Sequence, residues 1–556
     1  MRRPRIPQVH PVPIAVGIVV LVVLWLVRPI WHGLAMFFWT APIVWLPPLL
    51  LLGAGLVLLR RSRRSWATLD DLRAGVRPPV WLIAFPALAF LLFVLGAGFE
   101  GPLVGRAIVT HTTYEAIDGL PPGGLVRLVP REVAEQNASS GFNSPTETLT
   151  NFRIVNTDKG LVWTALRTPQ GAFRIFTKKS QGLVELGAED TARKLVTTDA
   201  ELQVAPGLQI TDNLRWRLLK RRFLISLEEP VGIPTPKGVR IVVPYLEYKG
   251  WLIRRPVLGG VFVVAPDGTI EDLSPQEAAR RPELARSGRI FPDTQARRVQ
   301  DAYQYKKGIW NTWFVHEDQT RINDTETNRQ PYLVDFGTSG LGLQWVTVAE
   351  PYGRAFAASA IFLTDAVTGH TRIWRVPRNE SLSGNVRALQ TVRSVAIPGV
   401  DFGSDGGGTG NGSGNFRVVE PRPVFVRGHL VYLASIIPIS ANAVSKTVVV
   451  DAETNKLVAI FNNDTDPQAD LKTRRYIETG QVPGEAAVTP PASSGTSTTP
   501  ATPGTTTTPA ASGGGTTTTP AAGDVQRRLD DVIRRQRELL DEVQKLRDDV
   551  GKSGGG

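Results

Sequence analysis

The sequence predicts an α+β protein. N-terminal transmembrane helices come first, followed by extracytoplasmic modules in tandem that each combine an antiparallel sheet with a helix, a disordered linker and a C-terminal coiled-coil helix. Three observations predict this class. The first 99 residues hold three long apolar runs, the central part alternates short helical patterns with β-branched and aromatic runs, and the end carries a Thr/Pro-rich stretch before a heptad pattern. The predicted domains are 1–99 (membrane anchor), 123–290 and 291–463 (two groups of α+β modules), 483–523 (linker) and 524–551 (coiled-coil helix).

The apolar runs Val12–Val27, Leu34–Leu59 and Val80–Phe99 are predicted to span a membrane. Between Pro29 and Leu59 the only titratable side chain is His32, and a stretch of this length can cross about 30 Å of hydrocarbon. A cleavable signal peptide is the alternative for the first run. A span is favoured because no small-x-small cleavage site follows it and a second apolar run begins almost at once.

Arginines predict the orientation of these spans. The turn between the first two spans holds only Arg28, whereas both flanking segments are strongly basic. The positive-inside rule therefore predicts a multi-pass protein of the cell membrane, with a cytoplasmic N-terminus and an extracytoplasmic C-terminal part. The arginines that carry this prediction are Arg2, Arg3 and Arg5 before the first span and Arg60, Arg61, Arg63, Arg64, Arg73 and Arg77 between the second and third.

Composition narrows the chemistry. The 556 residues contain no cysteine, which excludes disulfides, thiolate zinc sites and a cysteine nucleophile. The formal charge of +12 is concentrated near the predicted spans, where membrane topology and anionic lipid account for it, so no nucleic-acid partner is expected. One further basic run is interpreted as a solvated helix face, with an acidic wall polymer or the membrane surface as alternatives. It consists of Arg215, Arg217, Lys220, Arg221 and Arg222.

Three segments of the central region share one spacing. An aromatic residue precedes a proline by six positions in each: Trp163 and Pro169, Trp345 and Pro351, Tyr432 and Pro438. Self-similarity of this kind predicts repeated modules, with the three aromatic side chains buried at corresponding places.

Each later segment ends in a hairpin signature, and helical patterns precede the segments. Asp365–Gly369 and Asp451–Asn455 both read Asp-Ala-x-Thr followed by Gly or Asn, which favours a turn closed by the Asp carboxylate. Pro266–Thr269 is a similar turn. The first segment has Lys-Lys-Ser-Gln-Gly (178–182) where such a turn is expected. The helices are predicted at Pro130–Ala138, Asp293–Tyr305 and Asn385–Ile397.

This order of elements resembles the PepSY family of extracytoplasmic domains. The residues that carry the resemblance are Ala360–Val376 and Thr447–Phe461 with their preceding helices, while the segment from Gly123 to Leu186 departs from the pattern at its turn. The resemblance implies a cystatin-like helix-on-sheet module of the cell envelope, associated with peptidase regulation or protein interaction. It transfers no catalytic residue.

No candidate site emerges from the motifs. His316, Glu317 and Asp318 form the densest titratable set, but Trp310–Val315 is predicted as a strand, in which adjacent side chains point to opposite faces. The six histidines lack zinc-site spacing, and the Gly-rich segment 404–415 is interpreted as a flexible insertion because no helix opens directly after it. We therefore expect no catalytic, cofactor-binding or metal-binding residue.

The C-terminal region predicts a spacer and a partner-binding helix. Residues 483–523 cannot bury a core, and the following residues place apolar side chains on a heptad seam interrupted by Gln536. A helix lying back on the outer domain is the alternative to a coiled coil with a second copy or a partner protein. The seam consists of Val525, Leu529, Val532, Leu539, Val543, Leu546 and Val550.

These features favour a non-enzymatic, membrane-anchored protein of the cell envelope whose outer part is a structural or protein-interaction platform. A PepSY-type regulator that binds a peptidase or a peptide is the alternative. An enzyme acting on wall material is a third possibility, for which the sequence supplies neither a nucleophile motif nor a carboxylate pair.

Overall fold

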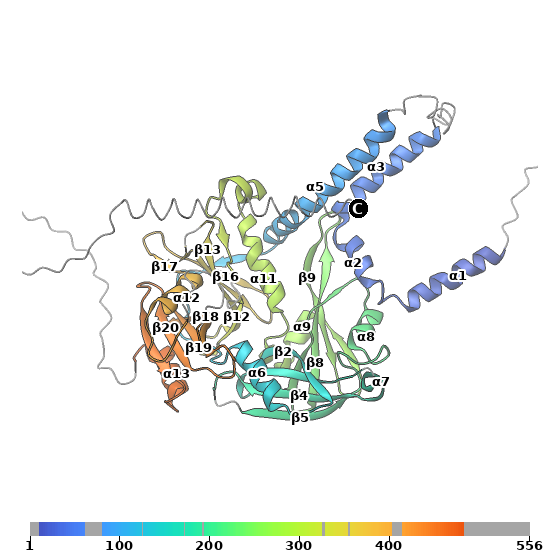
Figure 1. Ribbon diagram of the computed structural model, residues 1–556. Helices are drawn as coiled ribbons and strands as arrows, with labels where there is room; N and C mark the ends of the chain where they lie inside the picture. Colours follow the sequence, from blue (N-terminus) through green and yellow to red (C-terminus); the bar gives the residue numbers. More distant parts are fainter. Residues whose placement is uncertain are drawn as a thin grey trace, which may run out of the picture. The chain divides into compact units, whose positions relative to one another are not determined.

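The computed structural model describes residues 11–61, 80–124, 126–171, 173–191, 194–324, 329–353, 356–402 and 414–482. All of them belong to one compact unit, Met1–Val488. The predicted linker 483–523, the predicted coiled-coil helix 524–551 and nearly all of the Gly-rich segment 404–415 lie outside the described residues. Within the described part the predicted α+β class is confirmed, since helices accompany several antiparallel sheets (Figure 1).

Apolar helices form the N-terminal region. They are α1 (Pro11–Leu26), α2 (His32–Thr40), α3 (Pro42–Arg61) and α5 (Val80–Thr110). Among the described residues, one helical segment, Ala84–Thr110, is by itself long and apolar enough to cross a membrane. The segment pair His32–Thr40 and Pro42–Leu58 meets the same test only when taken together, and the apolar stretch Val16–Leu26 is shorter. The helix Ala84–Thr110 therefore supports an association with a membrane. The predicted three crossings stay a prediction.

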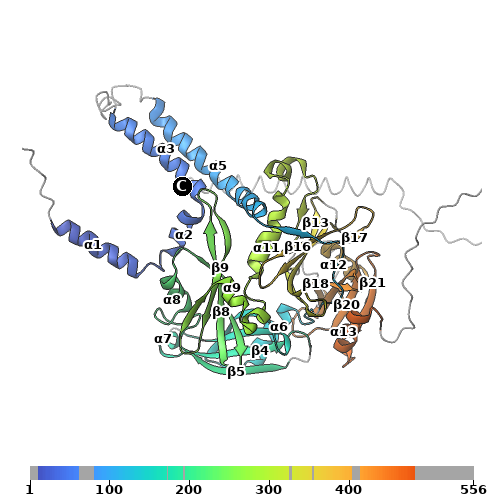
Figure 2. The same cartoon turned by 180° about the vertical axis from the view of Figure 1, so that it is seen from behind.

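Two of these helices differ from the predicted runs. The run Leu34–Leu59 is divided at Ala41, where α2 and α3 meet at a bend of 82°. Pro42 opens α3, a position that proline favours because its missing N–H has no helical partner there. The third helix does not end at Phe99 but continues to Thr110, with Ile108 and Val109 buried against the sheets. Helices α3 and α5 lie side by side in both views (Figures 1 and 2).

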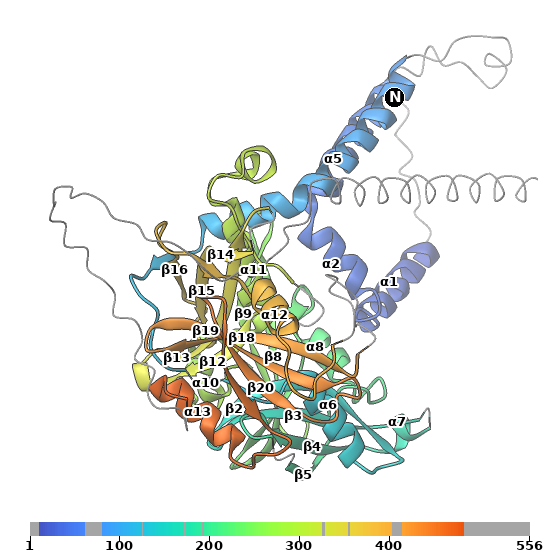
Figure 3. The same cartoon turned by 60° about the vertical axis from the view of Figure 1, so that its left-hand side comes forward.

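The described part of the chain after α5 contains four sheet units, each built around one helix and four antiparallel strands, to which shorter strands add in units 2 and 3. Figure 3 shows sheets of these units from a third direction. Unit 1 contains α6 (Arg131–Gly141), β2 (Glu147–Thr157), β3 (Gly160–Pro169), β4 (Ser180–Gly187) and β5 (Leu195–Leu202). Unit 2 contains α8 (Leu214–Arg221), β7 (Val231–Thr235), β8 (Gly238–Lys249), β9 (Arg255–Val264) and β10 (Ile270–Leu273). Unit 3 contains α11 (Asp293–Ala302), β12 (Tyr332–Phe336), β13 (Gly342–Pro351), β15 (Ala360–Asp365) and β16 (Thr371–Arg375). Unit 4 contains α12 (Asn385–Ser394), β18 (Phe416–Val426), β19 (His429–Pro438), β20 (Lys446–Asp451) and β21 (Leu457–Asn462).

The four strands of each unit pair in chain order and antiparallel, so each sheet is a meander. Shorter elements extend or connect the sheets. The strand β1 (Tyr114–Ala116), which follows α5, pairs in parallel with β16 and so joins the apolar helix to unit 3. The remaining elements are α7 (Arg174–Thr177), β6 (Ser226–Leu227), α9 (Pro275–Ala279), α10 (Pro282–Ser287), η1 (Tyr303–Tyr305), η2 (Asn311–Val315), β11 (Thr320–Arg321), η3 (Gly337–Ser339), β14 (Ala357–Ala358), β17 (Leu382–Ser383) and α13 (Ala469–Thr479).

Several apolar clusters connect neighbouring units, while one cluster around Phe362 lies within unit 3. One cluster joins Leu166 of unit 1 to Leu218 and Phe262 of unit 2. A second cluster joins unit 1 to unit 3, and a third joins units 3 and 4, where the rings of Phe336 and Phe425 stack with centroids 5.8 Å apart. Burial of contiguous apolar surface across the boundaries stabilises the units as one body.

The predicted helices are confirmed by α6, by α11 with the short helix η1, and by α12. Two local predictions are wrong. Trp310–Val315 is not a strand, because Asn311–Val315 forms the single-turn π-helix η2. The segment Lys178–Gly182 is not the closing turn of unit 1, because it leads directly into β4.

Candidate functional site

The three aromatic residues singled out by their spacing to proline are buried. Trp163, Trp345 and Tyr432 are 3%, 2% and 0% exposed, and each lies on the second strand of its unit. Their polar atoms all donate to a backbone carbonyl just before a helix. Trp163 Nε1 donates to Val129 (3.1 Å), Trp345 Nε1 to Phe291 (2.9 Å) and Tyr432 Oη to Ser383 (2.8 Å). In each case the acceptor lies two positions before the first helical residue.

The same three acceptor residues make a second matching contact. The N–H groups of Val129, Phe291 and Ser383 donate to the carbonyls of Ala188, Ala366 and Ala452, at 2.9, 2.9 and 2.6 Å. These alanines are fully buried and follow the third strand of each unit. Their own N–H groups donate to Leu161, Leu343 and Leu430, which stand two positions before the aromatic residue. The chain thus enters three helices through the same set of hydrogen bonds.

This pattern locates the turn of unit 1 that sequence reasoning missed. Ala188 lies in Gly187-Ala188-Glu189, directly after β4, and corresponds to the alanine of the two Asp-Ala turns. The residue that all three turns share, and that could have located this turn in the sequence, is the alanine and not the aspartate. Position 187 is a glycine, so the aspartate that precedes the alanine in the other two turns is absent here.

The aspartates of the other hairpins serve their turns. Asp365 Oδ1 accepts from the N–H of Thr368 (2.7 Å), Asp451 Oδ1 from the N–H of Thr454 (2.6 Å) and Asp267 Oδ1 from the N–H of Thr269 (2.9 Å). Residues with positive φ follow, as such turns require. The predicted role of these carboxylates in turns is confirmed.

The residues His316, Glu317 and Asp318 do not converge on one point. His316 stacks on Tyr352 with ring centroids 3.7 Å apart, and its Nδ1 lies 2.7 Å from Gln319 Oε1. The carboxylates of Glu317 and Asp318 both accept from Lys307 Nζ, at 2.7 and 2.8 Å. Hydrogen bonds and stacking in a tight loop therefore account for these side chains.

Two buried arginines connect unit 1 to unit 4. Arg422 is fully buried, and its Nη1 donates to the carbonyl of Leu128 (3.1 Å) while its Nη2 donates to Ser435 Oγ (2.6 Å). Arg127 forms an ion pair with Glu420 (3.0 Å). Burial lowers the pKa of Arg422 to about 10, and the Glu420 carboxylate opposes this shift. A buried cation of this kind is costly to leave unpaired, so the Glu420 carboxylate fixes how these two units dock.

The loops nearest the apolar helices form the strongest candidate for a functional surface. We call the segments Phe223–Ile225 and Trp251–Arg254, together with Trp310–Val315 that contains the short helix η2, the helix-facing loops. Phe223 meets Trp31 with ring centroids 4.9 Å apart, the guanidinium of Arg254 lies 3.5 Å from the ring centroid of Trp39, and Trp313 meets Phe99 at 4.8 Å. Separate units thus reach α2 and α5 at the ends of their apolar stretches (Figure 2).

Large aromatic side chains on these loops are exposed. Trp251, Trp310 and Phe314 are 78%, 71% and 61% exposed. Isolated exposed apolar residues are common, but aromatic residues next to apolar helices are typical of the interface between a membrane and water.

The basic run lies beside the same loops. Leu214, Leu218 and Leu219 of α8 are buried, and all five basic residues of the run are exposed, as a solvated helix face requires. Arg222 pairs with Glu247 (2.9 Å) and Asp272 (2.6 Å). Arg28, which precedes α2, donates to the carbonyl of Lys220. A role in binding an acidic polymer or the membrane surface stays a prediction.

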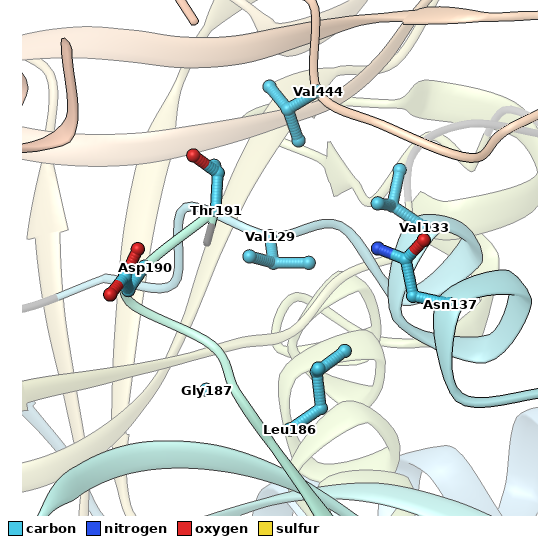
Figure 4. A pocket seen from close by; sticks show the side chains of 8 residues that line it. All are labelled: Val129, Val133, Asn137, Leu186, Gly187, Asp190, Thr191 and Val444. Atoms are coloured by element: carbon cyan, nitrogen blue, oxygen red, sulfur yellow. The ribbon is translucent and has the colours of Figure 1, made fainter. Parts of the chain in front are cut away.

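Cavities in the described part of the chain differ widely in volume. The small cavity in Figure 4, between α6, the turn after β4 and Val444, has a volume of about 10 Å³, which is room for one water molecule. A cavity of about 350 Å³ lies between α5, α11 and the β8–β9 hairpin. Within the described ranges, no group of three or more His, Asp or Glu residues is arranged to hold a metal ion.

No protein-family model matches the chain. A search of the curated proteins finds no match either.

Proposed function

We propose that the chain is a non-enzymatic, membrane-anchored protein of the cell envelope whose sheet units form an extracytoplasmic platform for protein interaction. The continuity of α5 carries this proposal. The helix that is apolar enough to cross a membrane runs without a break into the sheets, where Ile108 and Val109 are buried. Its Arg106 Nη1 donates to the carbonyls of Tyr305 (2.9 Å) and Lys306 (2.7 Å), so anchor and platform form one rigid connection.

Orientation follows from charge. The arginine-rich segments before α1 and between α3 and α5 belong on the cytoplasmic side, and an odd number of crossings then delivers the sheet units to the outside. The exposed aromatic residues of the helix-facing loops support this arrangement, because they suit the outer membrane interface.

We also propose that several of the sheet units are repeats of one module. The matching hydrogen bonds around Trp163, Trp345 and Tyr432 support the interpretation of units 1, 3 and 4 as tandem modules of one kind. Unit 2 shares their order of elements but has Ile241 at the position of the aromatic residue. A helix on a four-stranded meander is also compatible with the PepSY resemblance.

One observation favours the alternative of a regulator that binds a peptidase or a peptide. In the described part of the chain, β21 ends the sheet of unit 4 and pairs only with β20. Its side chains Val458 and Ile460 alternate along the strand and are each 40% exposed. An open edge with alternating apolar side chains is the kind of strand to which an extended peptide adds.

Two experiments test the proposal. A reporter fused after Gly123 is expected to be active only outside the cytoplasm, and a reporter in the loop 62–79 only inside. Activity of the first fusion inside the cell would contradict the outer platform.

Pull-down of the full chain from solubilised membranes tests the partner. Recovery of a peptidase that is lost in an Ile460→Lys variant, but kept in the matched variant Leu471→Lys on the exposed face of α13, favours regulation. Recovery of the chain itself, or of other envelope proteins equally with both variants, favours the platform.

A further inference from the structure

A cavity at the junction of the apolar helices and the sheet units is shaped by three elements. It has a volume of about 350 Å³, which lies within the range of small-molecule sites. One wall is the stretch of α5 from Glu100 to Ile108, and a second is the β8–β9 hairpin with Tyr248 and Arg254. The third wall is α11 with η1, and Thr40 at the end of α2 contributes to the rim.

The cavity lies where the apolar stretch of α5 ends. Residues 84–99 of α5 contain no charged side chain, and Glu100 is the first one along the helix after the apolar run. Aromatic contacts surround the same level, with Phe99 against Trp313 and Arg254 over Trp39. If the proposed function holds, this cavity therefore opens at the depth of the lipid headgroups.

Most polar side chains of the cavity already have partners. Asp301 pairs with Arg297 (2.9 Å), and Arg298 pairs with Glu228 (3.3 Å). Thr40 Oγ1 donates to the carbonyl of Met36 (2.8 Å). These side chains stabilise the cavity walls through their own partners and are therefore not available to bind a ligand.

Two opposite charges have no such partner within the described part of the chain. Arg254 forms no ion pair, and its Nε is buried without a hydrogen-bond partner. Glu100 forms neither a hydrogen bond nor an ion pair with the described residues, Arg254 included. Burial without a carboxylate partner lowers the pKa of Arg254, so an anion placed beside it would relieve an unfavourable charge.

We propose that this cavity binds the headgroup of a zwitterionic phospholipid, with the phosphate at Arg254 and the ammonium group at Glu100. A guanidinium forms strong charge-assisted hydrogen bonds to phosphate, and a carboxylate does the same with an ammonium group. Tyr248 and Tyr305 add aromatic surface for the cation, and Val104, Ile108 and Ala302 add apolar surface for the glycerol end of the lipid. The proposal rests on the proposed function, because it needs the cavity at a membrane surface.

The test uses the full chain purified in detergent and incubated with an equimolar mixture of phosphatidylethanolamine, phosphatidylcholine and phosphatidylglycerol. Retained lipid is counted by native mass spectrometry. The unmodified chain is expected to retain the two zwitterionic lipids over phosphatidylglycerol. Retention of phosphatidylethanolamine alone identifies a headgroup with ammonium N–H donors, and equal retention of phosphatidylcholine identifies recognition of the positive charge itself.

Three variants separate the contributions. Arg254→Gln is expected to lower retention of all three lipids at least about tenfold. Arg255→Gln is the matched control, since Arg255 is the next residue along the chain and does not line the cavity. Glu100→Gln is expected to keep lipid retention and lose the preference for zwitterionic headgroups. It does not disturb the contact of Arg254 with Trp39, so it tests the site even where Arg254→Gln impairs folding.

Equal retention by Arg254→Gln and Arg255→Gln, or an unchanged preference in Glu100→Gln, would overturn the headgroup site. Carbonate extraction of membranes from the same cells distinguishes this failure from failure of the proposed function. A chain that stays in the membrane without a lipid preference contradicts only the headgroup site, whereas release by carbonate contradicts the anchor.

Discussion

At the scale of single residues, one aromatic side chain holds a strand, a turn and a helix start together. Trp345 illustrates this: its ring packs among the buried side chains shared by units 1 and 3, and its indole N–H satisfies the carbonyl before α11. Arg289 lies over the same ring with 5.2 Å between the guanidinium carbon and the ring centroid, and its Nε donates to the carbonyl of Ile154 in β2 (2.7 Å). Arg127 stands at the matching position over Trp163 (5.1 Å). These residues therefore contribute both to their own unit and to its neighbour.

Replacement of Trp345 tests this role. Trp345→Ala is expected to lower the free energy of unfolding by about 3–5 kcal/mol, because it leaves a large cavity and an unpaired carbonyl. Trp310→Ala is the matched control: this tryptophan is 71% exposed, and its loss is expected to change stability by no more than about 0.5 kcal/mol. Thermal or denaturant unfolding of the purified full chain measures both. Equal losses would contradict the assigned burial.

A buried carboxylate predicts a dependence of stability on pH. Glu350 is 1% exposed and accepts a hydrogen bond from Asn323 Nδ2, and burial raises its pKa above the ordinary value of 4.5. The folded state therefore binds this proton more tightly than the unfolded state. The resulting stabilisation is complete below the unfolded pKa and is lost as pH rises through the folded pKa. Glu350→Gln is expected to remove this loss, so above the ordinary carboxyl pKa of 4.5 the stability of the parent should fall with rising pH relative to that of the variant. If the free energies of unfolding of parent and variant change with pH by the same amount over this range, the prediction is wrong.

At the scale of elements, α5 combines two environments in one helix. Its first part is apolar and lies beside α3, and its last part packs against α11 and η1. This close approach depends on Gly105, where an added Cβ would lie 2.5 Å from Cε2 of Tyr305. The close packing of Gly105 against Tyr305 thus fixes the direction in which the apolar first part of α5 leaves the sheet units.

Substitution of glycines in α5 tests that junction. Gly105→Ala is expected to destabilise the chain by about 1–3 kcal/mol through overpacking against Tyr305. Gly98→Ala on the same helix meets nothing within 4 Å of its Cβ and is expected to be neutral or to stabilise by up to about 1 kcal/mol. The double variant Gly105→Ala/Tyr305→Ala should show a favourable coupling energy in thermal unfolding, since the clash is removed. If the stability changes of the two single variants simply add in the double variant, the two residues are not in contact.

At the scale of the whole described part, the four sheet units share apolar clusters, and an ion pair of two buried groups joins the first unit to the last. Glu420 receives Arg127 at 3.0 Å, which joins residues almost 300 positions apart in the sequence. Such long-range contacts connect the described units into one body.

The predicted helix at the C-terminus is expected to associate. An isolated helix of this length is marginal in water unless its apolar stripe is covered, and the seam from Val525 to Val550 suits two or three chains. A peptide of residues 523–556 should therefore show weak, concentration-dependent assembly in sedimentation experiments, and Leu539→Asp should abolish it. A monomer with little helix at high micromolar concentration would leave a different protein as the helix's partner.

The sequence by itself determined the features that depend on neighbours along the chain. The apolar N-terminal runs, the helix at Asp293, the Asp365 and Asp451 turns and the burial of Trp163, Trp345 and Tyr432 follow from residue pattern, helix ends and turn chemistry. Tertiary structure decided what depends on distant contacts. Asn311–Val315 forms a π-helix against α5 although the residues of Trp310–Val315 favour a strand. The turn at Ala188 is fixed by hydrogen bonds to Leu161 and Val129 rather than by an aspartate. The cavity between Glu100 and Arg254 exists only because residues 154 positions apart face one space, and no local pattern encodes such a meeting.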